Sequence, residues 1–216
     1  MDYKVVEIFD SIEGEGKRAG ATASFIRLAG CNLRCSYCDT TYAMDGEYQI
    51  LSIPEILEKL DKAHIKRATI TGGEPLQVYD VKSLIHELLY VGYEVNIETN
   101  GSVDISPYLH FERMFFTIDY KLPSSGMAEK MLPSNFNQLR SWDVLKFVVG
   151  SDNDVKHMIS VLQKLESKPQ IYVGAVYGQY DLQKLAKHII EKPELRNVTM
   201  QLQFHKIIWN PNERGV

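Results

Sequence analysis

Short apolar runs alternate with amphipathic segments along the chain, and this alternation restricts the fold more than any other feature. The candidate strands are rich in β-branched and aromatic residues, and they are Val5–Phe9, Ala23–Leu28, Arg67–Thr71, Glu94–Glu98, Met114–Asp119, Val144–Val149, Ile171–Val176 and Val198–Phe204. The segments between them with helical periodicity are Ser52–Ala63, Val81–Val91, Asp154–Leu165 and Tyr180–Ile190. A β-α-β-α order predicts a mostly parallel sheet covered by helices.

The length of the chain limits how far such a sheet can close. A chain of 216 residues predicts a single domain over 1–216. A complete barrel of eight β/α units takes ~250 residues, so about six core strands fit a partial, incomplete parallel β/α barrel. An open doubly wound sheet fits the same pattern. Residues 120–142 form the longest irregular stretch, which we expect to be a loop over the mouth of the sheet.

Charge and hydropathy favour a small-molecule partner. The chain has 24 Lys and Arg against 28 Asp and Glu, for a net charge of −4. This weakly negative charge does not predict binding to nucleic acid or to an anionic membrane. No run approaches the ~18–20 apolar residues of a membrane span, and the N-terminus lacks the apolar core of a signal peptide. We therefore expect a cytoplasmic protein.

The three cysteines, Cys31, Cys35 and Cys38, have the spacing C-x3-C-x2-C. An odd, clustered set in a reducing compartment favours a metal or cluster site over disulfides. Cysteine thiolates are the usual ligands of iron–sulfur clusters, and three thiolates for four irons leave one iron open to a small molecule. A structural zinc site completed by a histidine is the alternative, although no histidine lies near in sequence.

Polar motifs follow several of the predicted strands. Thr71-Gly72-Gly73-Glu74-Pro75 and Glu98-Thr99-Asn100-Gly101-Ser102 each come at a strand end. Taken alone, each is an ordinary turn. Because the carboxyl ends of parallel strands meet at one edge of a sheet, we expect these motifs and the cysteine loop to line one cavity.

The pattern C-x3-C-x-aromatic-C, with Tyr37 as the aromatic residue, resembles the signature of the radical S-adenosylmethionine (SAM) superfamily. This resemblance implies a four-iron, four-sulfur (4Fe–4S) cluster on Cys31, Cys35 and Cys38, with the open iron binding the methionyl group of SAM. It also implies SAM contacts, which fall on Tyr37, Cys38, Asp39, Gly73, Glu74, Glu98, Asn100, Asp119 and Lys121.

Further segments make the chain similar to one family of that superfamily. They are residues 11–16 (SIEGEG), Cys38-Asp39-Thr40, residues 119–126 (DYKLPSSG), residues 203–206 (QFHK) and residues 209–216 (WNPNERGV). The family is that of the 7-carboxy-7-deazaguanine synthases. It converts 6-carboxy-5,6,7,8-tetrahydropterin to 7-carboxy-7-deazaguanine with loss of ammonia, on the route to queuosine, by way of a 5′-deoxyadenosyl radical.

The resemblance implies roles for individual residues. The implied substrate-binding residues are Ile12, Glu13, Gly14, Arg27, Thr71 and His205. The implied protein ligand of Mg²⁺ is Thr40. A planar guanidinium suits a substrate carboxylate, although a strand-end ion pair is the commoner role of an arginine such as Arg27. Taken alone, Thr40 is an ordinary turn residue, and its hydroxyl does not indicate a metal site. Catalysis is assigned to the cofactors and to no further side chain.

The family further implies a homodimer and an electron donor such as a flavodoxin-type protein. This chain departs from many relatives at Glu13, where they carry Gln, and at Gly174, where some carry a SAM-contacting Gln. It also runs on through Arg214-Gly215-Val216, past the point where some relatives end. The competing interpretations are a glycyl-radical-enzyme activase and a zinc-stabilised binding module without catalysis.

Overall fold

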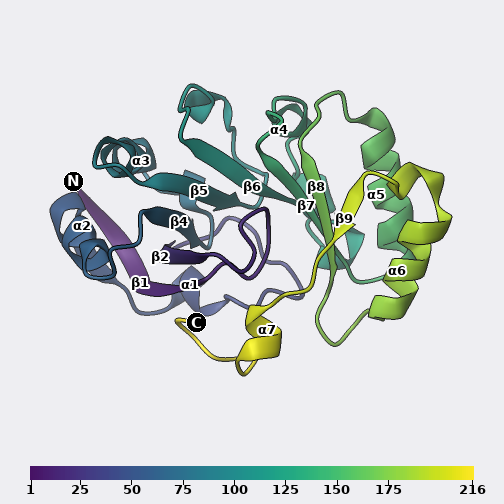
Figure 1. Ribbon diagram of the computed structural model, residues 1–216, viewed down its shortest axis with the longest axis horizontal. Coiled ribbons are helices and arrows are strands. Elements are labelled where there is room, and N and C mark those ends of the chain that lie inside the picture. The colour runs from purple at the N-terminus through teal and green to yellow at the C-terminus, as the bar shows by residue number, and fades with distance from the viewer.

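The computed structural model describes residues 1–216 and contains one nine-stranded sheet in the order β3–β1–β2–β4–β5–β6–β7–β8–β9 (Figure 1). The strands are β1 (Asp2–Ile12), β2 (Thr22–Leu28), β3 (Gln49–Ser52), β4 (Arg67–Gly72), β5 (Glu94–Thr99), β6 (Met114–Tyr120), β7 (Val144–Val149), β8 (Gln170–Ala175) and β9 (Val198–Met200). β1 is antiparallel to β2 and β3, whereas β2 and β4 through β9 pair in parallel. The predicted parallel α/β class is confirmed, with one parallel strand more than expected.

The four predicted helices are present, with ends shifted by a few residues. α2 (Ile53–Asp61), α3 (Val81–Tyr90), α5 (Asp152–Lys164) and α6 (Leu182–Glu191) follow β3, β4, β7 and β8. α2 begins at a capping box, in which the Ser52 backbone N–H donates to the Glu55 carboxylate at 2.8 Å. The short helices are α1 (Tyr42–Asp45), α4 (Pro133–Asn137) and α7 (His205–Ile208). No helix is both long and apolar enough to cross a bilayer.

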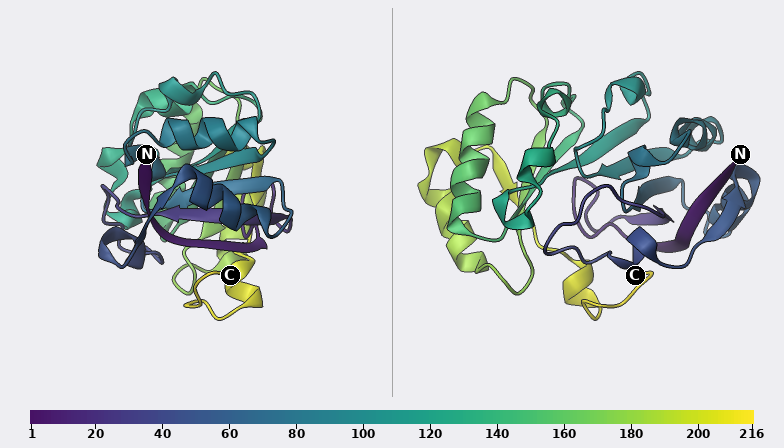
Figure 2. Two further views of the ribbon diagram at one scale, coloured as in Figure 1. Left: turned by 90° about the vertical axis from the view of Figure 1, so that its left-hand side faces the viewer. Right: turned by 180° about the vertical axis from the view of Figure 1, so that it is seen from behind.

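The sheet is curved and open, with β3 and β9 as its two edges. The long helices α3, α5 and α6 pack on the outer side of the curve, while α7 and the C-terminus lie across the inner side (Figures 1 and 2). The apolar core fills the space between the outer face and these helices, where Ile70, Ile97 and Leu84 have no exposed surface. Because apolar side chains fill the outer face of the sheet, its polar side chains are concentrated on the inner face.

The β1–β2 loop, residues 13–21, closes the end of this partial barrel at which the parallel strands begin. Arg18 donates to the Thr69 hydroxyl at 2.8 Å and to the Glu13 carboxylate at 2.6 Å. The Gln201 side chain makes two hydrogen bonds with the backbone of Gly16, at 2.7 and 2.8 Å. This loop therefore occupies the end of the barrel opposite the carboxyl ends of the parallel strands.

Several segments differ from the sequence-based expectation, and the edge strand β3 and the short helices α1 and α7 lie outside the predicted elements. Residues 120–142, predicted as a loop, contain three short helical turns, Pro123–Ser125, Ala128–Lys130 and Pro133–Asn137. β9 ends at Met200 instead of continuing to Phe204. It ends there because the next residues turn inward, where Gln201 binds Gly16 and the Phe204 N–H donates to the Gly14 carbonyl at 3.1 Å.

Candidate active site

A cavity of about 470 Å³ lies on the inner side of the sheet and reaches the carboxyl ends of the parallel strands. It brings together residues from the β1–β2 region, the cysteine loop, the ends of β4, β5 and β6, and the C-terminal segment. All predicted site residues except Glu13 and Glu74 line it, namely Ile12, Gly14, Arg27, Cys31, Cys35, Tyr37, Cys38, Asp39, Thr40, Thr71, Gly73, Glu98, Asn100, Asp119, Lys121 and His205. The motifs scattered along the sequence therefore share one space.

The cysteine loop joins β2 to α1 and presents three free, partly buried thiols to the cavity. It is held at Gly30, whose N–H donates to the Ala43 carbonyl at 2.8 Å, and at Ser36, whose hydroxyl donates to the Ser124 carbonyl at 2.6 Å. No three His, Cys, Asp or Glu side chains converge closely enough to hold a single metal ion, as a structural zinc site requires. Thiols spread around one space suit a 4Fe–4S cluster, in which each thiolate binds a different iron.

The turn after β4 packs directly against the cysteine loop. A Cβ placed on Gly73 would lie 2.0 Å from the Gly30 carbonyl oxygen and 2.7 Å from the Cys31 Cβ. The Glu74 N–H donates to the same Gly30 carbonyl at 2.8 Å. Only a glycine permits this approach of two backbones, so Gly73 sets the position of the cysteine loop.

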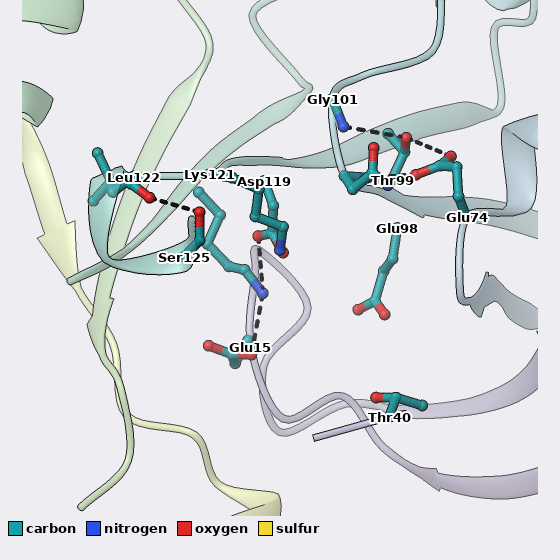
Figure 3. A network of polar contacts seen from close by, with 12 residues as sticks. Glu15, Thr40, Glu74, Glu98, Thr99, Gly101, Asp119, Lys121, Leu122 and Ser125 are labelled. Carbon is teal, nitrogen blue, oxygen red and sulfur yellow. Dashed lines mark hydrogen bonds and ion pairs between the residues drawn. The ribbon is translucent and has the colours of Figure 1, made fainter. Parts of the chain in front are cut away.

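Glu74 does not face the cavity, contrary to its expected SAM contact. Its carboxylate is 1% exposed and accepts hydrogen bonds from the Leu76 N–H at 3.0 Å, the Thr99 hydroxyl at 2.7 Å and the Asn100 N–H at 2.7 Å (Figure 3). Burial raises the pKa of this carboxyl to about 7, although these three donors oppose the shift. Glu74 is therefore a positioning residue that ties the turn after β4 to the end of β5.

Asn100 lines the cavity and also contacts the cysteine loop. Its side-chain N–H group lies 3.8 Å from the Cys31 sulfur and 3.0 Å from the Asn32 side-chain oxygen. Its own oxygen accepts from the Ser102 hydroxyl at 2.6 Å. A hydrogen bond to a ligating sulfur stabilises the thiolate and tunes the metal centre that it holds.

Glu98 presents a carboxylate to the cavity (Figure 3). One oxygen accepts from the Thr71 hydroxyl at 2.8 Å, which leaves the other without a protein partner. Burial raises the pKa of Glu98 to about 7, the Glu13 carboxylate adds to the shift, and the Lys146 ammonium opposes it. The side chain is suited to accept hydrogen bonds from ligand hydroxyls.

A chain of alternating charges forms a further wall of the cavity. Glu15 pairs with Lys146 at 3.1 Å, Lys146 with Asp119 at 3.2 Å, and Asp119 with Lys121 at 2.7 Å. Burial disfavours the ionised form of Asp119, but Lys121 and Lys146 outweigh it and hold its pKa below the usual value. Sequence reasoning missed Lys146, although a lone charge inside the apolar strand Val144–Val149 was a usable signal.

Tyr37 carries a buried hydroxyl that has no hydrogen-bond partner in the protein. Burial raises its pKa to about 12, so the phenol stays protonated. A buried donor without a partner is costly unless a ligand supplies one. This orphaned group therefore fits a cavity that binds a polar cofactor next to the cysteines.

Glu13 lies outside the cavity, contrary to the expected substrate contact. The side chain is 1% exposed and is held by Arg18 and by a short hydrogen bond from the Thr69 hydroxyl. The neighbouring Gly14 does line the cavity, and a Cβ there would lie 2.2 Å from Nδ1 of His205. Gly14 thus provides the space in which the His205 ring is seated.

Arg27 lies in an aromatic surrounding at the far end of the cavity. Its Nε donates to Glu7 Oε1 at 2.6 Å, which is the strand-end ion pair considered as the alternative. Its guanidinium carbon lies 5.6 Å from the Phe9 ring centroid, and Phe9 stacks on Phe25 at 5.0 Å. Both terminal nitrogens are left without a protein hydrogen bond, so Arg27 can bind Glu7 and a ligand at once. Glu7, Phe9 and Phe25 carry no signal in the sequence beyond their places in predicted strands.

Thr40 and Asp39 form a small group of oxygen atoms beside the cysteines. The Thr40 hydroxyl donates to Asp39 Oδ1 at 2.9 Å, and Asp39 Oδ2 pairs with the Lys206 ammonium at 2.6 Å. Burial disfavours ionisation of Asp39, but the Lys206 ammonium outweighs it and lowers the pKa to about 2. The Asp39 carboxylate is therefore charged and points toward the C-terminal segment.

Comparisons with known proteins agree with this geometry. Residues 25–115, which contain the cysteine loop and the ends of β4 and β5, match the Radical SAM superfamily. The chain is 44% identical to a 7-carboxy-7-deazaguanine synthase of Clostridium acetobutylicum, with 100% of both chains covered. It is 39% identical to one of Methanospirillum hungatei, with 96% of this chain and 86% of the relative covered.

A solved structure shares the fold at lower sequence identity. The crystal structure of QueE from Escherichia coli superposes with a TM-score of 0.79 at 22% identity and covers 95% of each chain. Streptococcus suis SuiB bound to its precursor peptide SuiA superposes with a TM-score of 0.60 at 14% identity, over 80% of this chain and 47% of that one. The fold of this chain is thus shared with these two structures.

The packing of Gly73 against the cysteine loop predicts the effect of a single methyl group. Gly73→Ala should displace the loop and lower iron incorporation during anaerobic reconstitution at least several-fold, as measured by iron content and visible absorbance. Gly174→Ala is the matched control, because a Cβ there meets no atom closer than 3.5 Å. Equal iron content in the two variants would contradict this role for Gly73.

The raised pKa of Glu98 predicts a pH-dependent stability. A carboxyl that titrates near pH 7 when folded but near 4.5 when unfolded makes the free energy of unfolding fall as pH rises between these values, by up to about 3 kcal/mol. Glu98→Gln removes this group, so its Tm should fall less between pH 5 and pH 8 than that of the parent protein. The exposed Glu58→Gln serves as control, and parallel Tm curves for all three proteins would refute the assignment.

Proposed function

This chain belongs to the 7-carboxy-7-deazaguanine synthase family of radical SAM enzymes, and we propose that it converts 6-carboxy-5,6,7,8-tetrahydropterin to 7-carboxy-7-deazaguanine with loss of ammonia. The observation that supports this most is the convergence of the cysteine loop, the Gly73 turn, Glu98 and Arg27 on one cavity. A zinc module needs no such cavity. An activase of a protein radical needs access for a polypeptide, whereas the C-terminal segment lines this cavity.

Cys31, Cys35 and Cys38 would hold the 4Fe–4S cluster, with SAM beside it. When bound, this pair supplies a 5′-deoxyadenosyl radical that abstracts a hydrogen atom from the substrate. The free oxygen of Glu98 would accept hydrogen bonds from the ribose hydroxyls, and the Tyr37 hydroxyl would gain the partner it lacks. Gly73 brings its backbone next to Cys31, close enough to contact the methionyl group.

The other end of the cavity would orient the pterin. The terminal nitrogens of Arg27 suit the substrate carboxylate, while Glu7 fixes the guanidinium through Nε. Ile12, Gly14, Thr71 and His205 line the same region and would contact the ring. Orientation of this kind determines which hydrogen of the substrate faces the radical.

We assign Mg²⁺ to the Thr40 hydroxyl, with the substrate carboxylate and water completing its shell. Magnesium prefers oxygen ligands and keeps few protein contacts, and Thr40 and Asp39 offer oxygens beside the cavity. We further propose that the protein is cytoplasmic, forms a homodimer and accepts electrons from a flavodoxin-type donor, as its family implies.

Anaerobic reconstitution followed by product analysis tests the function. The parent protein should bind about four irons and four sulfides per chain and form 7-carboxy-7-deazaguanine in the presence of SAM, a reductant and the carboxypterin. Cys35→Ala should lose the cluster absorbance and turnover together. One bound zinc would support the binding module, and SAM cleavage without deazaguanine product would support a different radical enzyme.

The magnesium assignment is tested by a change at one side chain. Thr40→Ala should lose most of the stimulation of turnover by Mg²⁺ while keeping the cluster spectrum, because only one oxygen ligand is removed. Thr40→Ser keeps the hydroxyl and should retain the stimulation. Undiminished Mg²⁺ stimulation in Thr40→Ala would remove this residue from the metal site.

A further inference from the structure

The last seven residues form a strap, Asn210–Val216, which lines the substrate end of the cavity. The strap runs from α7 back to β1 and α1, so that the C-terminus lies beside them (Figure 1). It packs closely there, since a Cβ placed on Gly215 would be 3.9 Å from Glu7 Oε2 and 3.9 Å from the Phe9 Cβ. The strap therefore reaches the group of residues that surrounds Arg27.

Arg214 stacks its guanidinium on the ring of Tyr42, with 3.9 Å between the guanidinium carbon and the ring centroid. Arg27 lies near the same ring at 5.7 Å, and the Tyr42 hydroxyl donates to Glu7 Oε1 at 2.8 Å. Tyr42 thus contacts two arginines and the carboxylate that binds one of them.

The two arginines at this end of the cavity differ in their partners. Glu7 pairs with Arg27 at 2.6 Å, whereas Arg214 has no carboxylate within ion-pairing distance and no hydrogen bond to the protein. Both arginines line the cavity. The terminal nitrogens of Arg27 and all those of Arg214 are thus free to bind an anion, and a planar carboxylate matches the fork of a guanidinium.

We propose that Arg214 is a second carboxylate-binding residue, which the strap brings over the pterin so that Arg27 and Arg214 together select a carboxylated substrate. This inference rests on the proposed function. Stacking on Tyr42 orders the long arginine side chain before the ligand arrives, which reduces the entropy lost on binding. The strap then discriminates against pterins that carry an uncharged group in place of the carboxylate.

Equilibrium binding to the reconstituted enzyme with SAM tests the proposal. The probes are 6-carboxytetrahydropterin and 6-methyltetrahydropterin, which differ in the carboxylate. Arg214→Ala should weaken binding of the carboxylated pterin about 10- to 100-fold, as expected for a lost charge-assisted hydrogen bond, and leave the methyl compound within about twofold. Arg214→Lys keeps the positive charge but loses the forked pair of nitrogens of the guanidinium. Its affinity for the carboxylated pterin should therefore lie between those of the parent protein and Arg214→Ala.

Two readouts separate this role from a structural one. Cluster absorbance and SAM cleavage in the absence of pterin should be unchanged in Arg214→Ala. Arg196→Ala, at an exposed arginine outside the cavity, should bind both pterins like the parent protein. Equal weakening of both pterins would make the strap a cover without carboxylate recognition, and an unchanged preference for the carboxylated pterin would overturn the proposal.

The same titrations show which of the two inferences fails. A parent protein that prefers the carboxylated pterin, with Arg214→Ala showing the same preference, refutes the role of Arg214 alone. A parent protein that binds neither pterin, although its cluster is complete and SAM is bound, refutes the proposed substrate and this inference with it.

Discussion

The contact between the Gly73 turn and the cysteine loop fixes the geometry on which the site depends. Two backbones meet there without an intervening side chain, and the Glu74 N–H bonds to the Gly30 carbonyl. The buried Glu74 carboxylate then holds Asn100, whose amide returns to the Cys31 sulfur. The ends of β2, β4 and β5 are thereby linked in one closed ring of contacts. Displacement at any point of this ring would move the thiols.

An incomplete barrel leaves its inner surface open, and loops supply the missing walls. The β1–β2 loop fills the end where the parallel strands begin, and its Glu15 pairs with Lys146 in the wall of the cavity. The strands contribute Arg27, Thr71 and Glu98, from β2, β4 and β5. The connecting segments contribute the cysteines, Tyr37 and the strap. Strands therefore position side chains at both ends of the cavity, and the loop at the carboxyl end of β2 carries the ligands of the proposed cluster.

Much of this arrangement was predictable because it follows from the periodicity of the apolar residues and from the spacing of the motifs along the chain. The strand and helix alternation predicted the parallel sheet, and the strand-end motifs predicted a shared cavity, which the structure shows. Spacing does not tell which way a side chain turns. Glu13 and Glu74 belong to recognisable motifs, yet both carboxylates are buried among protein donors outside the cavity. Arg214 enters the cavity through tertiary packing, which no local pattern encodes, whereas the only local signal for Lys146 was its charge inside an apolar strand.

One wall of the cavity comes from a part of the chain that is far from the cysteines in sequence. The cysteine loop, the Gly73 turn and the end of β5 contact one another, and the loop is also bonded to Ser124. The opposite wall is supplied by His205 and the strap. A change in the strap can therefore reshape the substrate chamber without moving the thiols.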